Sequence, residues 1–296
     1  MSATDAGPSV EGRPIAALLA AGPTLSFEFF PPRTPEAAAT LRATIADLAP
    51  LAPAFVSVTY GAGGTTRDLT HGLVVDLLAD GWNPMAHLTA VQHTRDELAG
   101  IVAGYRDAGV RNVLALRGDP PADVEPLRDL EHAADLLVLV REVAGDGTSI
   151  GVAAHPEGHP LATSLAEDRH HLAAKLEAAD FAVTQFFFEA AQWERLVDDL
   201  AALGCTRPVL PGIMPVTNLA QIERFAQLSG ATVPAWLVER LRAVGDDPAA
   251  VRAVGVEAAV GLCRDLLAAG APGLHLYTLN RSTATREIAA ALGLAA

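Results

Sequence analysis

Short apolar runs alternate along the chain with helix-length amphipathic stretches. Eight apolar runs occur, at residues 26–30, 55–60, 84–90, 112–119, 150–156, 181–188, 209–215 and 274–280. Between them apolar residues recur at spacings of three and four, for example over 35–48, 94–107, 129–144, 164–178, 189–202 and 282–293, a pattern typical of amphipathic helices. Strands that alternate with helices usually pair in parallel through crossover connections.

Eight strand–helix units in 296 residues predict an α/β fold, a closed (β/α)8 TIM barrel. An open, doubly wound sheet would usually have fewer strands. The longest stretch without a strand, 216–272, is helical in pattern and broken by Pro234 and Pro248, so we expect extra helices between strands seven and eight. No low-complexity linker divides the chain, and we expect a flexible N-terminal segment, 1–12, followed by one catalytic barrel, 13–296.

Polar side chains stand where several of these strands end. Glu28 is the most unusual, because it lies between Phe27 and Phe29 in an aromatic strand, and burial of an unpaired carboxylate is costly. A structural carboxylate paired with an arginine or with backbone donors is the plain alternative. Other strands end in the same way, with Thr59, His87, Arg117, Asp119, Gln185 and Tyr277. Since the working residues of such barrels lie at the carboxyl ends of the strands, the pattern indicates an enzyme's active face.

Composition and charge narrow the class of protein. Half of the residues are hydrophobic, which suits one large core, and the formal net charge of −14 disfavours nucleic acid as a partner. The N-terminus does not resemble a signal peptide and no apolar run approaches membrane-spanning length, so we expect a cytoplasmic protein without membrane contact. Cys205 and Cys263 lie far apart without other ligand residues, and no metal site is predicted.

Lys175 is the only lysine in the chain. A sole lysine could act as a Schiff-base nucleophile, but it falls within the helical stretch 164–178 instead of at a strand end. A phosphate contact and a solvated surface charge stay open as alternatives. The glycines of 61–64 follow a strand but lack the dinucleotide-binding fingerprint, so they predict only a tight turn.

Seven motifs together resemble the methylenetetrahydrofolate reductase family. They are SFEFFPPR at 26–33, VSVTYG at 56–61, HLT at 87–89, ALRGD at 115–119, TQFFF at 184–188, PGIMPV at 211–216 and LYTLNR at 276–281. The match runs in order from about residue 25 to residue 290 and is similar to the short bacterial type, a catalytic barrel alone. The resemblance implies that FAD takes hydride from NADH or NADPH and then reduces 5,10-methylenetetrahydrofolate to 5-methyltetrahydrofolate. That ping-pong reaction would feed methionine synthesis.

The resemblance also implies a role for individual residues. Glu28 matches the acid that protonates N10 of the folate, and Asp119 matches the charge that stabilises the cationic iminium. Contacts to FAD are implied for Thr59, His87, Arg117, Gly118, Asp119, His155, His159, Asp168 and Lys175. Contacts to folate or to the nicotinamide nucleotide are implied for Gln185, Gln221, Phe225, Tyr277 and Arg281. For Phe225 the alternative is ordinary helix packing.

One departure and several rivals bear on this interpretation. His155 stands where the family usually carries a tyrosine, which puts the affinity for flavin in question. The rivals are a flavin barrel similar to proline dehydrogenase, whose motifs do not match, a flavin-free folate-binding methyltransferase barrel, and a barrel that only binds folate or nucleotide. The family forms dimers and tetramers, so a homo-oligomer is implied. The choice between NADH and NADPH stays open.

Overall fold

A computed structural model describes residues 11–61, 66–119, 127 and 129–294 of the chain. In this part of the chain, nine parallel strand segments form one sheet in the order β7-β6-β5-β4-β3-β2-β1-β9-β8. The segments are β1 (Thr24–Phe29), β2 (Phe55–Val58), β3 (Pro84–Thr89), β4 (Asn112–Leu116), β5 (Ser149–Ala154), β6 (Phe181–Thr184), β7 (Val209–Leu210), β8 (Gly212–Ile213) and β9 (Gly273–Tyr277). The expected flexible segment 1–12 falls almost entirely outside the described residues and stays a prediction.

Segments β7 and β8 are the two halves of one strand, separated by Pro211. Proline has no N–H to donate, so the ladder is interrupted there. β7 pairs with β6 on one side, and β8 pairs with β9 on the other. The Pro211 carbonyl still accepts a hydrogen bond of 3.0 Å from the backbone N–H of His275. The bent strand therefore joins both edges of the sheet, and the predicted (β/α)8 barrel is confirmed.

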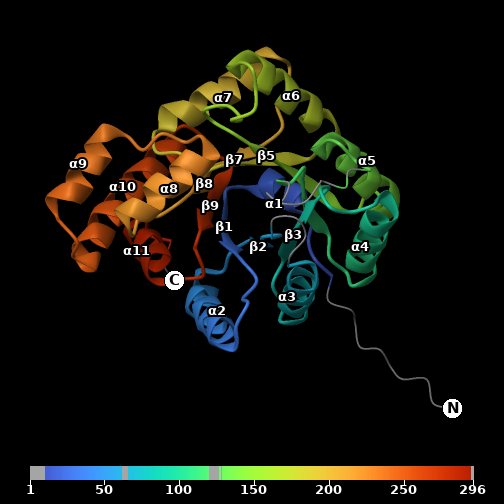
Figure 1. Ribbon diagram of the computed structural model, residues 1–296, viewed down its shortest axis with the longest axis horizontal. Coiled ribbons are helices and arrows are strands. Elements are labelled where there is room, and N and C mark those ends of the chain that lie inside the picture. The colour runs from blue at the N-terminus through green and yellow to red at the C-terminus, as the bar shows by residue number, and fades with distance from the viewer. Residues whose placement is uncertain (1–10, 62–65, 120–126, 128, 295–296) are drawn as a thin grey trace.

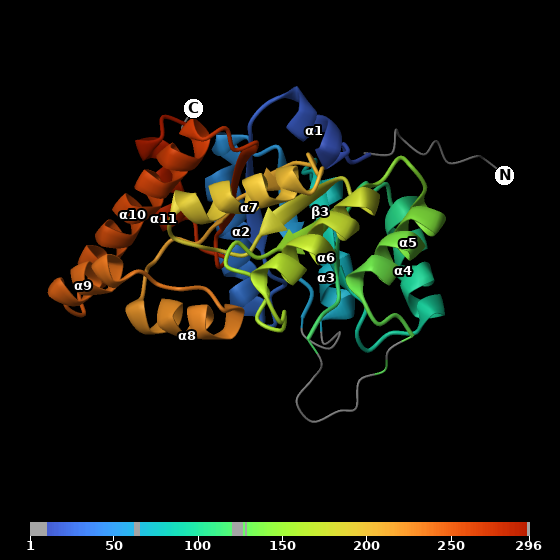
Figure 2. The same cartoon turned by 90° about the horizontal axis from the view of Figure 1, so that it is seen from above.

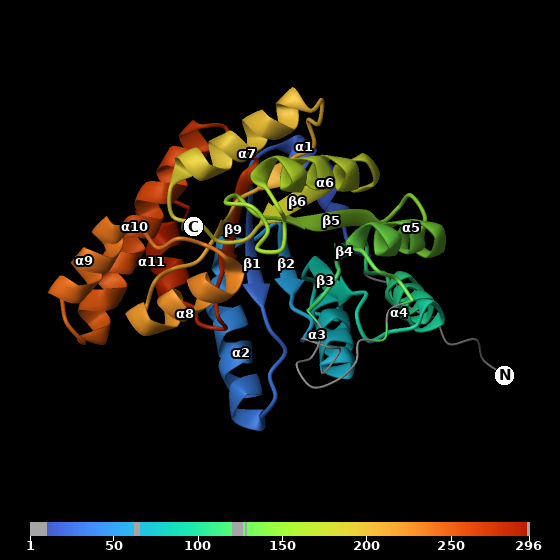
Figure 3. The same ribbon diagram turned by 45° about the horizontal axis from the view of Figure 1, so that its top comes forward.

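Helices surround the strands. They are α1 (Ile15–Ala21), α2 (Pro35–Leu48), α3 (Arg67–Ala79), α4 (Arg95–Asp107), α5 (Ala133–Ala144), α6 (Leu165–Ala178), α7 (Ala190–Ala202), α8 (Leu219–Ser229), α9 (Ala235–Ala243), α10 (Pro248–Ala268) and α11 (Thr283–Ala291), with a 3₁₀ turn η1 (Ala49–Leu51). Helices α2 to α7 lie outside the strands (Figures 1 and 3). The extra helices expected in 216–272 are α8, α9 and α10, which group with α11 on one side of the barrel (Figure 1).

Helix α1, which the sequence pattern did not predict, closes the amino-terminal end of the barrel. Its Ile15 and Leu19 pack against inward-facing apolar side chains of the strands, among them Phe55, Met85, Leu114 and Phe181. In Figure 2, α1 and α8 lie at opposite ends of the barrel. A seven-residue helix makes only two turns, too few for a clear amphipathic pattern. Because the floor is apolar and packed, ligands reach the barrel interior from the carboxyl ends of the strands.

None of the helices that the structure describes is long and apolar enough to cross a lipid bilayer.

Candidate active site

Glu28 points into the barrel near the carboxyl end of β1. Alternation along β1 turns Phe27 and Phe29 outward, where both are fully buried in the main hydrophobic core, and turns Ser26 and Glu28 inward. The Glu28 side chain keeps a fifth of its area exposed. The register places Glu28 next to Ser57 on β2 and next to Tyr277 on β9. The carboxylate is thus held by the sheet and still open to the mouth of the barrel.

Three polar side chains from strands β2, β3 and β9 surround the Glu28 carboxylate. His87 Nε2 on β3 lies 3.5 Å from Glu28 Oε2, and His275 Nε2 on β9 lies 3.8 Å from the same oxygen. The Ser57 hydroxyl lies 3.4 Å from it as a hydrogen-bond donor. No arginine or lysine of the described residues pairs with Glu28, so the plain alternative of an arginine-bound structural carboxylate finds no support.

His275, a residue that sequence reasoning missed, lies behind this carboxylate. It is fully buried, and its Nδ1 lies 2.8 Å from the Ser26 hydroxyl while its Nε2 lies 3.3 Å from the Ser57 hydroxyl. The ring also stacks on Phe55 at 5.7 Å between centroids. Two hydroxyls and a stacked ring fix the imidazole. The signal was present in the sequence, since His275 lies two residues before Tyr277 and therefore on the same face of β9.

His87 is neutral at physiological pH. Burial lowers its pKa to about 4, with the Glu28 carboxylate opposing the shift and His275 adding to it. Its Nε2 has no hydrogen-bond partner within the described part of the chain. The structure places His87 beside Glu28 in the barrel interior, with 6% of its surface exposed. Its implied contact with FAD stays a prediction.

Tyr277 closes the wall of the barrel above this cluster. Its hydroxyl donates a 2.6 Å hydrogen bond to the backbone carbonyl of Thr184 at the end of β6. Burial first, and the Glu28 charge second, raise the pKa of Tyr277 well above its usual value, so the phenol keeps its proton. Gly212 on β8 lies between the two residues, and a Cβ there would collide with both the Thr184 carbonyl and the Tyr277 hydroxyl. Glycine at 212 therefore permits the Tyr277–Thr184 contact.

A cleft of about 890 Å³ opens beside Phe30, just beyond the end of β1. Its walls include Gln221 and Phe225 of α8, Tyr277 of β9 and Arg281 of the following turn. Four of the five side chains expected to contact folate or nicotinamide therefore line one cleft, large enough for either ligand. The fifth, Gln185, lines a separate small pocket with His155, and its Oε1 accepts a 3.0 Å hydrogen bond from the backbone N–H of Phe186.

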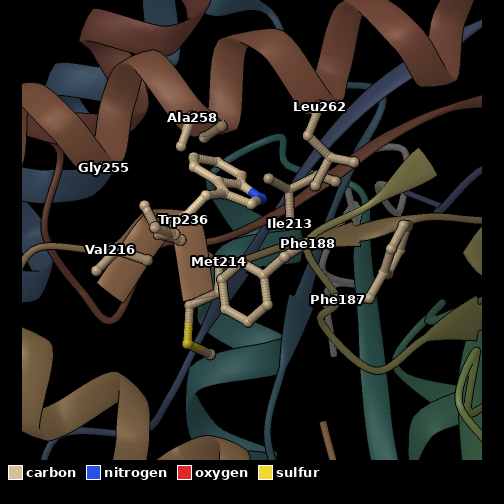
Figure 4. A pocket seen from close by; sticks show the side chains of 11 residues that line it. Phe187, Phe188, Ile213, Met214, Val216, Trp236, Gly255, Ala258 and Leu262 are labelled. Atoms are coloured by element: carbon tan, nitrogen blue, oxygen red, sulfur yellow. The ribbon is translucent and has the colours of Figure 1, made fainter. Parts of the chain in front are cut away.

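Another pocket, which is apolar, lies between the end of β8 and helix α10 (Figure 4). Its side chains, Phe187, Trp236 and Leu262 among them, leave only about 10 Å³, too little for any ligand. Gly255 of α10 would collide with the Val216 carbonyl if it carried a Cβ. Close packing at Gly255 therefore fixes the segment that leads into α8 and its cleft residues.

Apart from His87 of β3, the residues expected to hold FAD follow β2, β4 and β5 or lie on α6. Thr59, half-buried, follows β2 and donates its backbone N–H to the Phe29 carbonyl at 2.9 Å. Arg117 and Asp119 follow β4 with their charged atoms 4.0 Å apart, and 91% of the Asp119 side chain is exposed. Gly118 between them has φ +80°, and a Cβ there would lie 2.6 Å from Val91 Cγ1. Only glycine suits that backbone and that space.

His155, His159 and Lys175 lie near one another beyond the end of β5 and on α6, and His159 is also close to Arg117. The rings of His155 and His159 meet edge to face at 4.7 Å. Burial lowers the pKa of His155 to about 4, with His159 adding to it, and burial and the Arg117 charge lower the pKa of His159. Lys175 is half-buried, its pKa is lowered by burial, and it donates a long 3.4 Å hydrogen bond to the Ala153 carbonyl. Its remaining donor capacity suits a phosphate and argues against a solvated surface charge.

Glu28 lies on β1 and Asp119 follows β4, and no described contact joins them. Asp168 is also expected to contact the flavin. Both of its carboxylate oxygens accept hydrogen bonds within the protein, one from the N–H of His159 and one from Arg169. Among the described residues no group of His, Cys, Asp and Glu is arranged to bind a metal ion.

Comparison of the sequence with known proteins shows the family to which the chain is similar. The sequence profile of the family described as methylenetetrahydrofolate reductase matches residues 15–293. The 5,10-methylenetetrahydrofolate reductase of Escherichia coli is 39% identical over 273 residues, 91% of this chain and 90% of its own length. Methylenetetrahydrofolate reductase 1 of Schizosaccharomyces pombe is 38% identical over 92% of this chain but only 46% of its own length.

A solved structure shows the same fold. A Clostridium thermocellum protein that binds two copies of 5-methyl-5,6,7,8-tetrahydrofolic acid superposes with a TM-score of 0.66 at 15% identity, and the match covers 95% of this chain and 97% of the other. At that identity the likeness supports the barrel fold alone.

Proposed function

From the premise that the chain belongs to the methylenetetrahydrofolate reductase family, we propose that it works with FAD and NADH or NADPH in a ping-pong hydride transfer. As a reductase of that family it acts on methylenetetrahydrofolate. The observation that carries the finer proposal is Glu28, an inward carboxylate between two buried histidines at the mouth of the barrel, next to a cleft lined by Phe225 and Tyr277. The 5-methyl product would supply methionine synthesis.

The residues at the ends of β4 and β5 fit a flavin dinucleotide. Arg117 and Lys175 both act on His159 and form a basic group in which Lys175 has unused donor capacity, and a diphosphate needs cations and N–H donors. Gly118, with φ +80° and Val91 and Thr89 packed against it, sets the turn that carries Arg117 and Asp119 to this end of the barrel. When bound, FAD would supply the chemistry of accepting hydride from the nicotinamide and of passing it on to the folate. Thr59, His87, His155 and Asp168 complete the proposed contacts.

Glu28 is the proposed proton donor to N10 of the folate. The proton moves from the carboxyl group to N10, the bond between N10 and the bridging carbon breaks, and the cation forms at N5. Ser57 and His275 hold the carboxyl group from behind, and neutral His87 flanks it. The part of Glu28 that is exposed gives the carboxylate access to solvent, from which it regains its proton.

Asp119 is proposed to offset the positive charge on the folate. Its carboxylate lies in solvent at the rim, with Arg117 at 4.0 Å, so it can approach a ligand that enters above the barrel. Electrostatic stabilisation of a developing cation requires a charge that the site has placed beforehand. The cleft residues Gln221, Phe225 and Arg281 would bind the nicotinamide nucleotide or the folate, with Phe225 offering a ring face for stacking, and Gln185 would contact the pterin.

A homo-oligomer in the cytoplasm is part of the proposal, on the strength of the family resemblance and of the sequence expectations.

The first test is the visible absorption spectrum of the purified protein, with and without added FAD, followed by anaerobic addition of NADH and then of methylenetetrahydrofolate. A flavin band that bleaches with NADH and recovers with the folate is the expected result, and it would exclude the flavin-free methyltransferase alternative. A protein that stays colourless and gains no flavin would contradict the cofactor assignment.

A further inference from the structure

Arg169 of α6 is buried and holds the segment that follows β5. With 2% of its surface exposed, its guanidinium group donates to two backbone carbonyls and to two carboxylates. The carbonyls are those of His155 at 3.0 Å and Pro156 at 2.6 Å, and the carboxylates are those of Asp168 at 2.8 Å and Asp199 at 3.2 Å. All three nitrogens of the guanidinium group are used.

Such a group is not needed for stability alone. Taking a guanidinium and the Asp168 carboxylate out of water is costly, and apolar side chains of similar volume often give equal or greater stability at such sites. What the planar fork adds is direction, because it fixes the two carbonyls and the two carboxylates relative to one another. The arrangement therefore points to a requirement for an exact placement of residues 155–156.

The clamped segment, residues 155–160, is also held from its other side. The Asp168 carboxylate that binds Arg169 accepts a 3.2 Å hydrogen bond from the backbone N–H of His159. Glu157 accepts a 2.9 Å bond from the N–H of Thr232, just after α8. Arg169 and Asp168 of α6 thus bind the segment through its backbone, and the residues beyond α8 bind it through Glu157.

We infer that Arg169 is a positioning residue for the flavin site. It holds His155 and His159 next to the basic group formed by Arg117 and Lys175. The inference rests on the proposed function, since it concerns the same site. No atom of Arg169 needs to touch the ligand. Its effect comes through the two carbonyls and through Asp168, whose side chain is shared between Arg169 and the His159 N–H.

Arg141 of α5 provides a matched control at the other end of the same strand. Its guanidinium group donates to the Thr148 carbonyl at 2.8 Å, just before β5, and to the Asp180 carboxylate at 3.1 Å. Arg141 therefore clamps the segment that enters β5, at the amino-terminal end of the barrel, as Arg169 clamps the segment that leaves it. Loss of Arg141 should cost stability without reaching the flavin.

The experiment compares Arg169→Leu, Arg169→Lys and Arg141→Leu by two measurements. Hydrogen–deuterium exchange in the flavin-free protein reports on the segment itself, whose amides at Gly158, His159 and Ala162 are hydrogen-bonded. Titration with FAD, followed by flavin fluorescence, gives the dissociation constant. We expect faster exchange over 157–163 and an FAD dissociation constant raised about tenfold or more in Arg169→Leu, the equivalent of one charge-assisted hydrogen bond. Arg169→Lys should fall between this variant and the wild type.

Arg141→Leu should lower Tm while the dissociation constant for FAD stays within about twofold of the wild type. An Arg169→Lys protein that exchanges faster but binds FAD with unchanged affinity would overturn the inference, because Arg169 would then be structural only. If Arg169→Leu fails to fold, Arg169→Lys and Asp199→Asn, which removes the outermost carboxylate, decide the question in the same way. A wild type that binds no FAD would instead contradict the proposed function, and the exchange data would still show whether Arg169 holds the segment.

Discussion

The side chain of Asn280 binds both backbone groups of Phe30. Asn280 Nδ2 donates to the Phe30 carbonyl at 2.8 Å, and Oδ1 accepts from the Phe30 N–H at 3.0 Å. The ladder between β1 and β9 ends at Glu28 and Tyr277, so the amide continues the pairing by side-chain bonds where the backbone turns away with φ +55° at Asn280. Beside it, the Thr278 hydroxyl donates to the Glu28 carbonyl at 2.6 Å. The turn after β9 therefore fixes the end of the strand that carries Glu28.

Replacing Asn280 by alanine should lower the free energy of unfolding by about 1–3 kcal/mol, because two backbone groups lose their partner. It should also slow folate reduction more than flavin reduction by NADH, since Glu28 shifts while the cofactor contacts stay in place. Urea unfolding and stopped-flow kinetics of the two half-reactions measure these effects.

Asn83 supplies the matched control for Asn280. It binds both backbone groups of Arg13 in the same way, at 2.9 and 3.0 Å, but at the amino-terminal end of the barrel. Asn83→Ala should be destabilised to a similar degree and keep the wild-type ratio of the two half-reactions. An equal change of that ratio in both variants would show that general loosening, and not the position of Glu28, is responsible.

Glu28→Gln should keep bound flavin and its reduction by NADH, and lose folate reduction by about 10²- to 10⁴-fold, the usual contribution of one proton transfer. The amide has nearly the same shape and can still accept a hydrogen bond from Ser57, so the fold should be retained. Anaerobic mixing of the NADH-reduced variant with methylenetetrahydrofolate measures the affected step. Equal loss of flavin reduction would mean that Glu28 is structural.

Ser57→Ala should slow folate reduction about tenfold, because the hydroxyl lies between Glu28 and His275 and helps to hold the carboxyl group that donates the proton. The measurement is the rate of the folate half-reaction between pH 6 and 9. Ser149→Ala is the control, since Ser149 is equally buried but accepts its 3.0 Å bond from Ala16 at the barrel floor. A rate in Ser57→Ala equal to that of the control would show that Ser57 does not contribute to the placement of Glu28.

The sequence predicted the helices and strands that surround this site better than the side-chain contacts inside the barrel. The helix expected over 35–48 is α2 with the same bounds, because the apolar spacing continues over the whole stretch and Thr34 caps the first turn. The interior depends on contacts between strands that lie far apart in the chain. His275 meets Ser26 across 249 positions, and no local pattern reports that distance.

The contacts of Arg169 could not be predicted from the sequence either. Two of its partners are backbone carbonyls, which every residue carries, so no side-chain pattern can identify them. The splitting of the seventh strand was within reach, since Pro211 removes a donor in the middle of an apolar run. By contrast, the place of Gln185 outside the main cleft depends on the path of the backbone after β6.

Buried neutral histidines should make the protein less stable as the pH falls. The pKa of His155 is lowered to about 4, so between that value and the ordinary histidine pKa of about 6.5 the unfolded chain binds a proton that the folded chain excludes. Stability therefore declines as the pH is lowered through this interval, by up to about 1.4 kcal/mol per pH unit for each such histidine, and levels off below it. His87 adds a second group of the same kind.

His155→Tyr isolates one of these two groups. Urea unfolding at pH 7, 6 and 5 should show that the free energy of unfolding falls less steeply with pH in the variant. The slope should be smaller by up to about 1.4 kcal/mol per pH unit, because tyrosine does not titrate in this range. His170→Gln, a change on the exposed face of α6, is the control. A variant whose stability falls as steeply as that of the wild type would show that His155 is protonated in the folded protein.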